Sequence, residues 1–469
     1  MGKLSRRYFI RNSAIGMGLC GCRLVGDLFA GSGVSRRGSK RPNIIVILTD
    51  DQRWNSLGCA GNSIIFTPEM DRLARQGIRF ANAFVTTPIC AASRATVFTG
   101  LYERTHGYTF TKPPIAEEFV RISYPYLLKR AGYRTGFVGK FGVKVQKEIL
   151  DDMFDEFRTT GFPYFKKVGG KERHLTDINM ERALEFIRGC GEDETFCLSL
   201  SFWAPHADDG RTEQYFWPKD CDTLYRNVKI PPAAASDPAF FESHPVFLRE
   251  SMNRKRWYWR FDTPEKYQQM VKGHYRMISG IDRALGRLRE ELRRRKLEDK
   301  TVIILMGDNG YFLGERGYAG KWTMHEPSIR VPLIVYDPRL DLSRRGSVPE
   351  QPVLNLDLAP TILEMAGLKV PEKAEGRSLV PLIAGRKTSW RKVVFTEHLW
   401  EHPEIPVTEA VRTERWKYIR YPQHPEYEEL YDLKHDFWEM NNLAKDARYQ
   451  DTLIKMRKQC DEMIRLMTS

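Results

Sequence analysis

The segment "RPNIIVILTDDQR", Arg41–Arg53, sets the architecture expected for this chain. From Asn43 to Leu48 its residues form a short run rich in β-branched side chains without polar alternation, which is typical of a strand buried on both faces. Asp50 and Asp51 follow near its carboxyl end. Similar runs alternate with helix-like segments along the chain. This alternation predicts an α/β fold, in which a large mixed, mostly parallel sheet lies between helices.

Three further strand candidates end in polar residues. "RTGFVGK" ends at Lys140, "TFCLSLSFWAPH" ends at His206, and "KTVIILMGDNG" leads to Asp308 and Asn309. In open α/β sheets, ligands bind outside the carboxyl ends of the strands. We therefore expect these side chains to converge with the two aspartates of the first strand on one pocket.

The chain is expected to have three parts. Residues 1–40 are read as an export signal and linker, and residues 41–368 as the catalytic domain. Residues 369–469 are read as a small α+β subdomain, because short strand-like segments such as "KVVFTEH" and "EELYDL" precede a helix from about Ala447 to the end. This subdomain is predicted to combine a small antiparallel sheet with that helix.

The charge of the chain favours anionic partners. Its 469 residues carry a formal net charge of +14, with a sequence pI of about 9.3. Nucleic acid, anionic membranes and sulfated or phosphorylated substrates all fit this balance. The sequence has no zinc-finger spacing and no aromatic-rich signature for binding single strands, so no nucleic-acid partner is expected.

The N-terminus has the features of a targeting segment. In "SRRYFIRNSAIGMGLCGC", Arg6 and Arg7 precede an apolar run that is shorter than the ~20 residues needed to cross a bilayer. The paired arginines resemble a twin-arginine export signal, and "LCGC" resembles a bacterial lipobox with Cys22 as the lipidated residue. An ordinary signal peptide is the alternative. The protein is expected to be exported in a bacterium, as a periplasmic, lipid-anchored or secreted protein.

The remaining six cysteines are irregularly spaced and form no CxxC motif. A dense disulfide framework is not expected in so long a chain. A single bridge, such as one between Cys190 and Cys197, stays open.

The converging polar residues predict a site for a hard cation. Asp50, Asp51, Asp308 and Asn309 offer only oxygen ligands, which suit Ca²⁺ or Mg²⁺. Zinc would require a spacing of histidine or cysteine that does not occur. Taken alone, the aspartate pair can be a helix cap and "GDNG" a turn. Their common position after strands favours the metal site.

Cys90 lies in "CAASRATVFTG", which continues from a Pro-Ile loop into a helix-like segment. The start of a helix favours anions, and Arg94, one turn further, can reach the same anion with its guanidinium fork. A thiolate there can be a nucleophile. As a ligand of a hard cation, however, an oxygen-bearing derivative of the cysteine fits better.

"CAASR" followed by "TG" resembles the signature of type I sulfatases of the alkaline phosphatase superfamily, in which the cysteine is oxidised to formylglycine. Other segments look like sulfatase segments in family order, among them "TPEMDRLARQGIRFANAF", "GDNGYFLGERG" and "GKWTMHEPSIRVPLIVYDP". The resemblance covers roughly residues 41–445, and the ordered set of motifs is highly specific.

The resemblance implies a role for each candidate residue. Formylglycine at position 90, hydrated at the cation, attacks the sulfur, and Arg94 and Lys140 steady it. His206 and Lys321 touch the sulfate, one as proton donor to the leaving oxygen and the other as electrostatic clamp. The implied metal ligands are Asp50, Asp51, Cys90, Asp308 and Asn309. Ca²⁺ is the expected ion, with Mg²⁺ as the alternative. The implied maturation partner is a formylglycine-generating enzyme or an anaerobic sulfatase-maturating enzyme.

Two departures from the family pattern stand out. Ala92 occupies a position that is commonly proline. The run "GKFGVK" also lacks the histidine that many members carry shortly after the lysine, and has Gly142 in that region. His106 and His325 are additional candidates near the site, but a structural or substrate-contact role is expected for each.

Together these features predict a metal-dependent sulfatase that acts on sulfate esters of a carbohydrate or a glycosaminoglycan-like polysaccharide. One alternative is a phosphodiester or phosphonate monoester hydrolase of the same superfamily, and another is a catalytically silent carbohydrate-binding relative. The basic, aromatic stretch "NRKRWYWRFDTPEKYQ", residues 253–268, is either a surface helix or a substrate-facing loop. In the second case its arginines and tryptophans suit an anionic sugar polymer.

Overall fold

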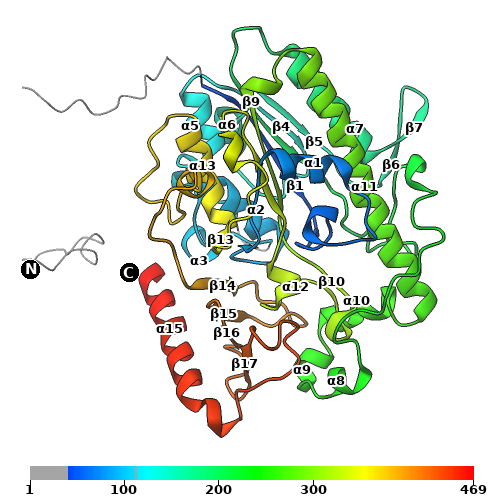
Figure 1. The fold of residues 1–469 in the computed structure, drawn as a ribbon, viewed down its shortest axis with the longest axis vertical. Coiled ribbons are helices and arrows are strands. Elements are labelled where there is room, and N and C mark those ends of the chain that lie inside the picture. The colour runs from blue at the N-terminus through cyan, green and yellow to red at the C-terminus, as the bar shows by residue number, and fades with distance from the viewer. Residues whose placement is uncertain (1–40, 111–112, 469) are drawn as a thin grey trace, which may run out of the picture. The chain divides into compact units, whose positions relative to one another are not determined.

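The computed structural model describes residues 41–110 and 113–468 (Figure 1). The predicted export signal, with Arg6, Arg7 and the candidate lipid-anchor Cys22, lies outside the described residues. Within the described part, no helix combines the length and the apolar character that crossing a bilayer requires. From Arg41 onward the described residues form one compact unit, and the predicted boundary after residue 368 stays a prediction.

A seven-stranded sheet forms the centre of this unit, with the strand order β2-β12-β9-β1-β8-β4-β5. Its strands are β1 (Asn43–Thr49), β2 (Ile78–Arg79), β4 (Arg134–Gly139), β5 (Glu156–Thr159), β8 (Phe196–Ser201), β9 (Thr301–Gly307) and β12 (Leu333–Tyr336). The run from β9 to β5 is parallel, and β12 is antiparallel to both of its neighbours. The predicted large, mixed, mostly parallel sheet is therefore confirmed.

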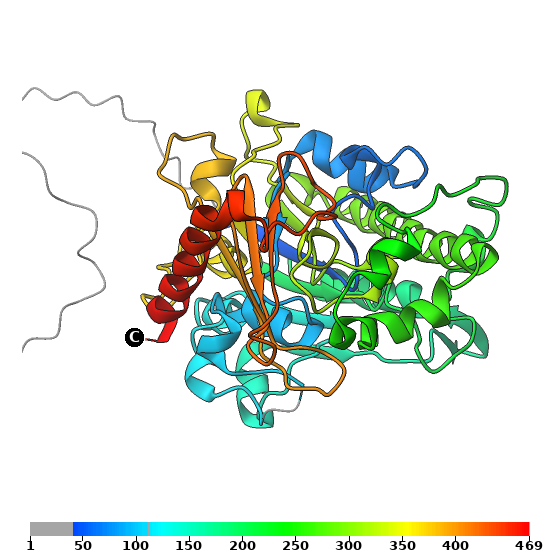
Figure 2. The same ribbon diagram turned by 90° about the horizontal axis from the view of Figure 1, so that it is seen from below.

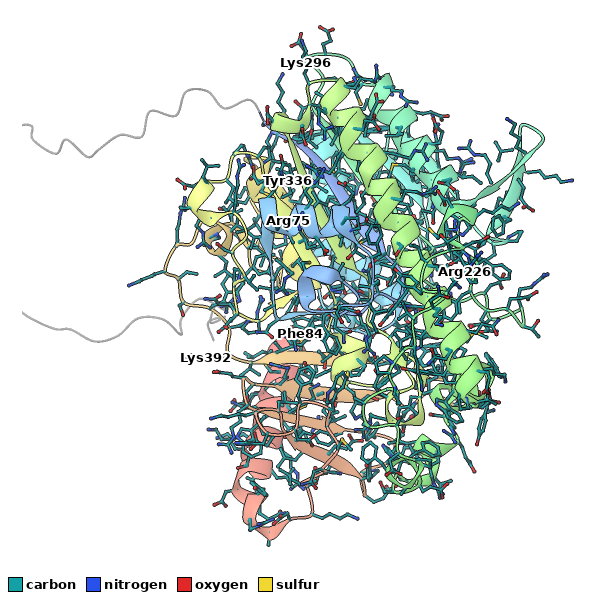
Figure 3. All side chains as sticks on the ribbon, turned by 45° about the vertical axis from the view of Figure 1, so that its right-hand side comes forward. Arg75, Phe84, Arg226, Lys296, Tyr336 and Lys392 are labelled. Carbon is teal, nitrogen blue, oxygen red and sulfur yellow. The ribbon has the colours of Figure 1, made fainter. Side chains whose placement is uncertain are left out.

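β1 lies in the middle of the parallel run, and both of its faces are buried. Ile44, Val46 and Leu48 belong to one hydrophobic core, whereas Ile45 and Ile47 belong to the other. This explains why the strand shows no polar alternation. Figure 3 shows side chains filling the space between the sheet and its helices.

Helices cover both faces of the sheet (Figure 1). The first core receives α2 (Cys90–Thr99), α5 (Tyr124–Arg130), α6 (Lys147–Met153) and α13 (Leu358–Met365). The second core receives α1 (Pro68–Gln76), α7 (Leu175–Gly189) and α11 (Pro264–Arg294). Shorter elements connect these parts: β3 (Ala83–Phe84), α3 (Glu103–His106), α4 (Glu117–Val120), β6 (Phe165–Val168), β7 (Lys171–His174), α8 (Pro238–Glu242), α9 (Val246–Arg249), α10 (Met252–Arg260), β10 (Phe312–Leu313), β11 (Ala319–Gly320), α12 (Glu326–Ile329), β13 (Val353–Leu354) and α14 (Val380–Ile383).

The C-terminal region contains the predicted small antiparallel sheet and helix. Its strands are β14 (Val394–His398), β15 (Thr408–Arg412), β16 (Trp416–Arg420) and β17 (Glu428–Asp432). Figure 2 shows α15 (Gln450–Thr468) lying along this sheet, and α15 contacts its two middle strands. Ala447 begins a single 3₁₀ turn, so the α-helix itself starts three residues later than expected.

Buried ion pairs join this sheet to the large domain. Lys417 Nζ lies 2.8 Å from Glu326 Oε1 and 2.6 Å from Glu439 Oε1, and all three side chains are fully buried. His325 Nε2 contacts Glu429 Oε2 at 2.8 Å. Removing one partner of such a pair leaves an uncompensated buried charge, which is strongly destabilising. The two parts are therefore held together by charge as well as by apolar packing.

The described cysteines are all free thiols, so the bridge left open between Cys190 and Cys197 does not form. Cys197 lies inside β8, and Cys190 caps the end of α7, where its thiol donates to the carbonyl of Phe186 at 3.3 Å.

Two buried carboxyl groups at the same interface predict that stability depends on pH. Burial and the nearby charge of Glu397 raise the pKa of Glu103 to about 8, and burial, partly offset by Arg104, raises the pKa of Glu397 to about 7. The folded state then binds more protons than the unfolded state between the ordinary pKa of 4.5 and these values. Stability from these groups is fully present at acidic pH and is lost as the pH rises through 7 and 8.

We expect Glu103→Gln to reduce this loss, because the glutamine cannot ionise. Denaturant unfolding between roughly pH 5 and 8.5 measures the loss, and a tenfold change in proton affinity between the folded and unfolded states corresponds to about 1.4 kcal/mol. Glu118→Gln, at an exposed position, is the matched control and should keep the wild-type slope. An identical slope in wild type and Glu103→Gln would contradict the assignment.

Candidate active site

Three strands of the large sheet deliver buried polar side chains to one place, as their carboxyl ends predict. Asp50 and Asp51 follow β1, Lys140 follows β4, and Asp308 follows β9, and all of these side chains are buried. Ligand atoms of Asp50, Cys90 and Asp308 all lie within 4.8 Å of one another. The expected convergence is therefore present.

Three buried acceptor oxygens in this cluster have no hydrogen-bond partner among the residues that the structure describes. They are Asp50 Oδ1, Asp51 Oδ2 and Asn309 Oδ1. A buried acceptor without a partner is costly, and a hard divalent cation bound by oxygen would satisfy all three. The residues present thus fit Ca²⁺ or Mg²⁺. The amide nitrogen of Asn309 donates to Asp51 Oδ1 at 2.6 Å, and this bond fixes the orientation of the Asn309 side chain.

Three cationic side chains surround the three carboxylates. Lys140 Nζ pairs with Asp50 Oδ2, and Lys321 Nζ donates to Asp51 Oδ1 at 2.5 Å. Arg94 Nε donates to Asp308 Oδ2 at 2.9 Å. These charges cancel one another. A bound divalent cation would therefore give the pocket a net positive charge. Such a pocket would attract an anion such as a sulfate ester.

The charged side chains of this cluster also shift the pKa values of one another. Burial opposes the charge of Asp50, but Lys140, His206, Lys321 and Arg94 outweigh it and lower its pKa. Burial also opposes the charge of Lys321, but Asp51, Cys90, Asp50 and Asp308 raise its pKa well above the usual value. Burial and the charge of Asp50 raise the pKa of Asp308 to about 6. Asp50 and Lys321 are therefore charged at neutral pH.

The backbone of the cluster is strained at one aspartate. Asp51 has a φ of 67°, in the left-handed region that residues other than glycine seldom adopt. In this conformation its N–H donates to Asp308 Oδ1 at 3.3 Å. Such strain persists where surrounding contacts impose it, and it is frequent at functional sites.

Cys90 is the first residue of α2, as predicted, and only 3% of it is exposed. Arg94 lies one turn further along the same helix. Its Nη1 donates to the carbonyl of Lys140 at 2.6 Å and also to Ser201 Oγ. The helix therefore places residue 90 and Arg94 together at the metal cluster.

Gly142, in the region where the histidine expected after Lys140 is missing, lies against the side chain of Arg94. Gly142 has a φ of 72°, and a Cβ added there would lie 2.8 Å from Arg94 Cδ. The side chain of Arg94 thus occupies the room that a residue larger than glycine would need.

His206 joins the cluster at its edge. Its Nε2 lies 3.8 Å from Asp51 Oδ2, its side chain is 14% exposed, and its Nδ1 contacts the carbonyl of Ala207 at 2.6 Å. Burial lowers its pKa. Among the residues assigned to the site, His206 is the most exposed.

The two additional histidines belong to other contacts. His106 bonds to Thr96 Oγ1 at 3.1 Å and accepts from the N–H of Tyr108. His325 is bound by Glu429 of β17. Both therefore have structural partners, as expected.

Sequence reasoning missed several residues around the site. Ser201 binds Arg94, the ring of Trp203 lies under Lys140, with Nζ 4.5 Å from its centroid, and Asp209 is close enough to His206 for their charges to interact. A usable signal existed only for Asp209, which lies in a second aspartate pair three residues after His206.

Two family models match this chain. The family model described as Sulfatase matches residues 42–368, and one described as N-sulphoglucosamine sulphohydrolase, C-terminal, matches residues 314–465. The chain is 28% identical to an N-acetylglucosamine-6-O-sulfatase of Bacteroides thetaiotaomicron, over 88% of this chain and 84% of that protein.

Solved structures share the fold. One, described as a complex with its substrate D-glucosamine-2-N,6-O-disulfate, has a TM-score of 0.78 and 25% identity, over 92% of this chain and 98% of that one. A phosphonate monoester hydrolase of Agrobacterium radiobacter has a TM-score of 0.77 and 21% identity, over 91% of this chain and 96% of that one, which shows the fold alone.

We expect Ca²⁺ or Mg²⁺ to raise the unfolding temperature of chelator-treated protein, because the ion binds the folded site. Asp308→Asn removes one ligand charge and should weaken cation binding about tenfold or more, measured by calorimetric titration. Asp341→Asn, on an exposed turn, is the control and should bind as the wild type does. Wild-type protein that responds to neither ion would contradict the site.

Proposed function

This chain belongs to the sulfatase family of sulfuric ester hydrolases, and we propose that it hydrolyses sulfate esters of a carbohydrate, with formylglycine at position 90 as nucleophile. The proposal rests on the convergence of residue 90 with Asp50 and Asp308 within 4.8 Å at the start of a helix. A thiol is a poor ligand for a hard cation. Oxidation of Cys90 to the aldehyde, followed by hydration, would supply oxygen at that position instead.

The metal and the chain would divide the chemistry between them. When bound, a hard divalent cation at Asp50, Asp51, Asp308 and Asn309 withdraws charge from oxygen ligands and activates a coordinated hydroxyl group. Arg94 and Lys140 hold the carboxylates in place, and they balance negative charge beside residue 90. Their positions are fixed before substrate arrives, so little reorganisation is required during the reaction.

His206 and Lys321 are the residues proposed to act on the ester itself. Lys321 is almost fully buried and donates to Asp51, which suits a fixed positive charge facing the sulfate oxygens. His206 is more exposed, at the edge where the alcohol part must leave. We therefore assign the proton donor to His206 and the electrostatic clamp to Lys321.

The substrate class draws support from two sources. The relative from Bacteroides thetaiotaomicron and the solved complex both concern sulfated amino sugars. The net charge of +14 also favours a polyanionic substrate. A phosphonate or phosphodiester hydrolase is the second candidate, favoured by the shared fold of the phosphonate monoester hydrolase. Parallel assays with an aryl sulfate and an aryl phosphonate separate the two.

We also propose that the protein is exported, because Arg6 and Arg7 precede a short apolar run that ends at Cys22. Maturation at position 90 would then require a formylglycine-generating or anaerobic sulfatase-maturating enzyme in the producing cell. Fractionation of cells that make the full chain tests the location, and retention of the whole chain in the cytoplasm would contradict it.

We expect mass spectrometry of the tryptic peptide Phe80–Arg94 to detect an aldehyde at position 90 when the protein is made with a competent modifying enzyme. Cys90→Ala should lower sulfatase activity by about 10³-fold or more, because it removes the nucleophile. Cys59→Ala, in a 3₁₀ turn outside the cluster, is the matched control and should stay active. Full turnover by Cys90→Ala would rule out the assigned nucleophile.

We expect His206→Gln to reduce hydrolysis of a sugar sulfate much more than hydrolysis of 4-nitrophenyl sulfate. An alkoxide is a poor leaving group and needs the proton, whereas nitrophenolate does not. Lys321→Met should reduce both to a similar extent, because the sulfate group is common to them. Equal losses with both substrates in His206→Gln would remove the proton-donor role.

A further inference from the structure

Helix α10, which includes the first part of the basic and aromatic stretch 253–268, is attached directly to the segment that carries Lys321. Asn253, which is buried, donates from Nδ2 to the carbonyl of Lys321 at 2.8 Å and to that of Ala319 at 3.3 Å. The helix is therefore fixed relative to a residue of the active site. Of the stretch 253–268, residues up to Arg260 belong to α10 and residues from Pro264 belong to α11, and the first turn of α10 contacts the segment that carries Lys321.

Arg256, one turn further along α10, lies on Trp322. The guanidinium carbon is 4.7 Å from the centre of the indole ring. Trp322 packs with Ile89 and Ala92, which lie on either side of residue 90 in the sequence. The backbone N–H of Trp322 donates to the carbonyl of Pro88 at 3.2 Å. Its φ of 81° is strained for a tryptophan. The ring thus connects the start of α2 to Arg256.

Asp209 fixes Arg256 from the opposite loop. This residue lies three positions after His206 and pairs with Nη2 of both Arg256 and Arg260. The Arg256–Asp209 pair therefore ties the loop of His206 to the loop of Lys321. These are the two residues proposed to act on the sulfate and the leaving oxygen, so the pair lies where the alcohol part of a substrate must be placed.

The charges of this group do not cancel. Two guanidinium groups share one carboxylate, which leaves one positive charge. Arg256 is 14% exposed, whereas Arg260 is fully buried. Nε of Arg256 and Nε and Nη1 of Arg260 are buried donors without a hydrogen-bond partner among the described residues. Arg256 lies on the indole ring of Trp322, and its Nη2 pairs with Asp209. The other N–H groups of its guanidinium can then bind an oxyanion.

We propose that Arg256, Asp209 and Trp322 form a leaving-group subsite, in which Arg256 binds a second anionic group, a carboxylate or sulfate, on the sugar that carries the ester. The inference rests on the proposed function and deepens it. The enzyme selects sugars with two anionic groups over sugars whose only anionic group is the sulfate that is removed.

The test uses 4-nitrophenyl sulfate as substrate and sulfated saccharides as competing ligands. Pairs of saccharides carry the same sulfate ester with or without a second sulfate or a carboxylate. Wild-type enzyme should bind the doubly anionic member of each pair more tightly. In Arg256→Met this preference should fall about tenfold, because a charge-assisted hydrogen bond is lost. Arg256→Lys should keep part of it, because the charge remains but the fork is lost.

Lys255→Met is the matched control, since Lys255 lies on the same helix, loses the same charge and is about half exposed. It should keep the wild-type preference. An unchanged preference in Arg256→Met, or a wild type without any preference, would overturn the inference. Comparing the saccharides that carry a second sulfate with those that carry a carboxylate identifies which oxyanion Arg256 binds. Wild-type enzyme that cleaves neither 4-nitrophenyl sulfate nor any sulfated saccharide would instead overturn the proposed function.

Discussion

Three buried carboxylates set the main requirement on this structure. Asp50, Asp51 and Asp308 are crowded at the ends of two adjacent parallel strands, and each is fully buried or nearly so. Such a cluster is tolerable only if positive charge surrounds it. Arg94, Lys140 and Lys321 supply that charge, and each comes from a different part of the fold.

The requirement also links folding to chemistry. Of the cations that make the carboxylates tolerable, Lys321 is also the group proposed to bind the sulfate, and Arg94 and Lys140 are proposed to balance negative charge beside residue 90. Because the side chains balance one another first, the ion adds its charge to an otherwise neutral pocket. The same side chains thus have a structural and a chemical function, and a substitution among them is expected to alter both.

Much of this arrangement could be predicted from sequence, because the relevant signals are local. β1 is a continuous apolar run that ends in two aspartates, and the start of α2 at Cys90 follows from a loop that becomes helical. The contacts that escaped prediction are long-range. The path of Arg94 past Gly142, its bond to Ser201 and the pairing of Asp209 with α10 all join segments far apart in the chain. The hydrophobic periodicity of a sequence does not indicate which loop contacts which other loop.

The charged contacts beneath the C-terminal sheet have a consequence for how such a protein can diversify. Glu326 receives two of its cationic partners, Lys417 and Arg412, from that sheet, and His325 receives Glu429. If another sheet replaced this one, these charged groups would remain buried without counter-ions. New specificities are therefore more accessible through the loops at the rim than through exchange of modules, and truncation before β14 should not leave a folded enzyme.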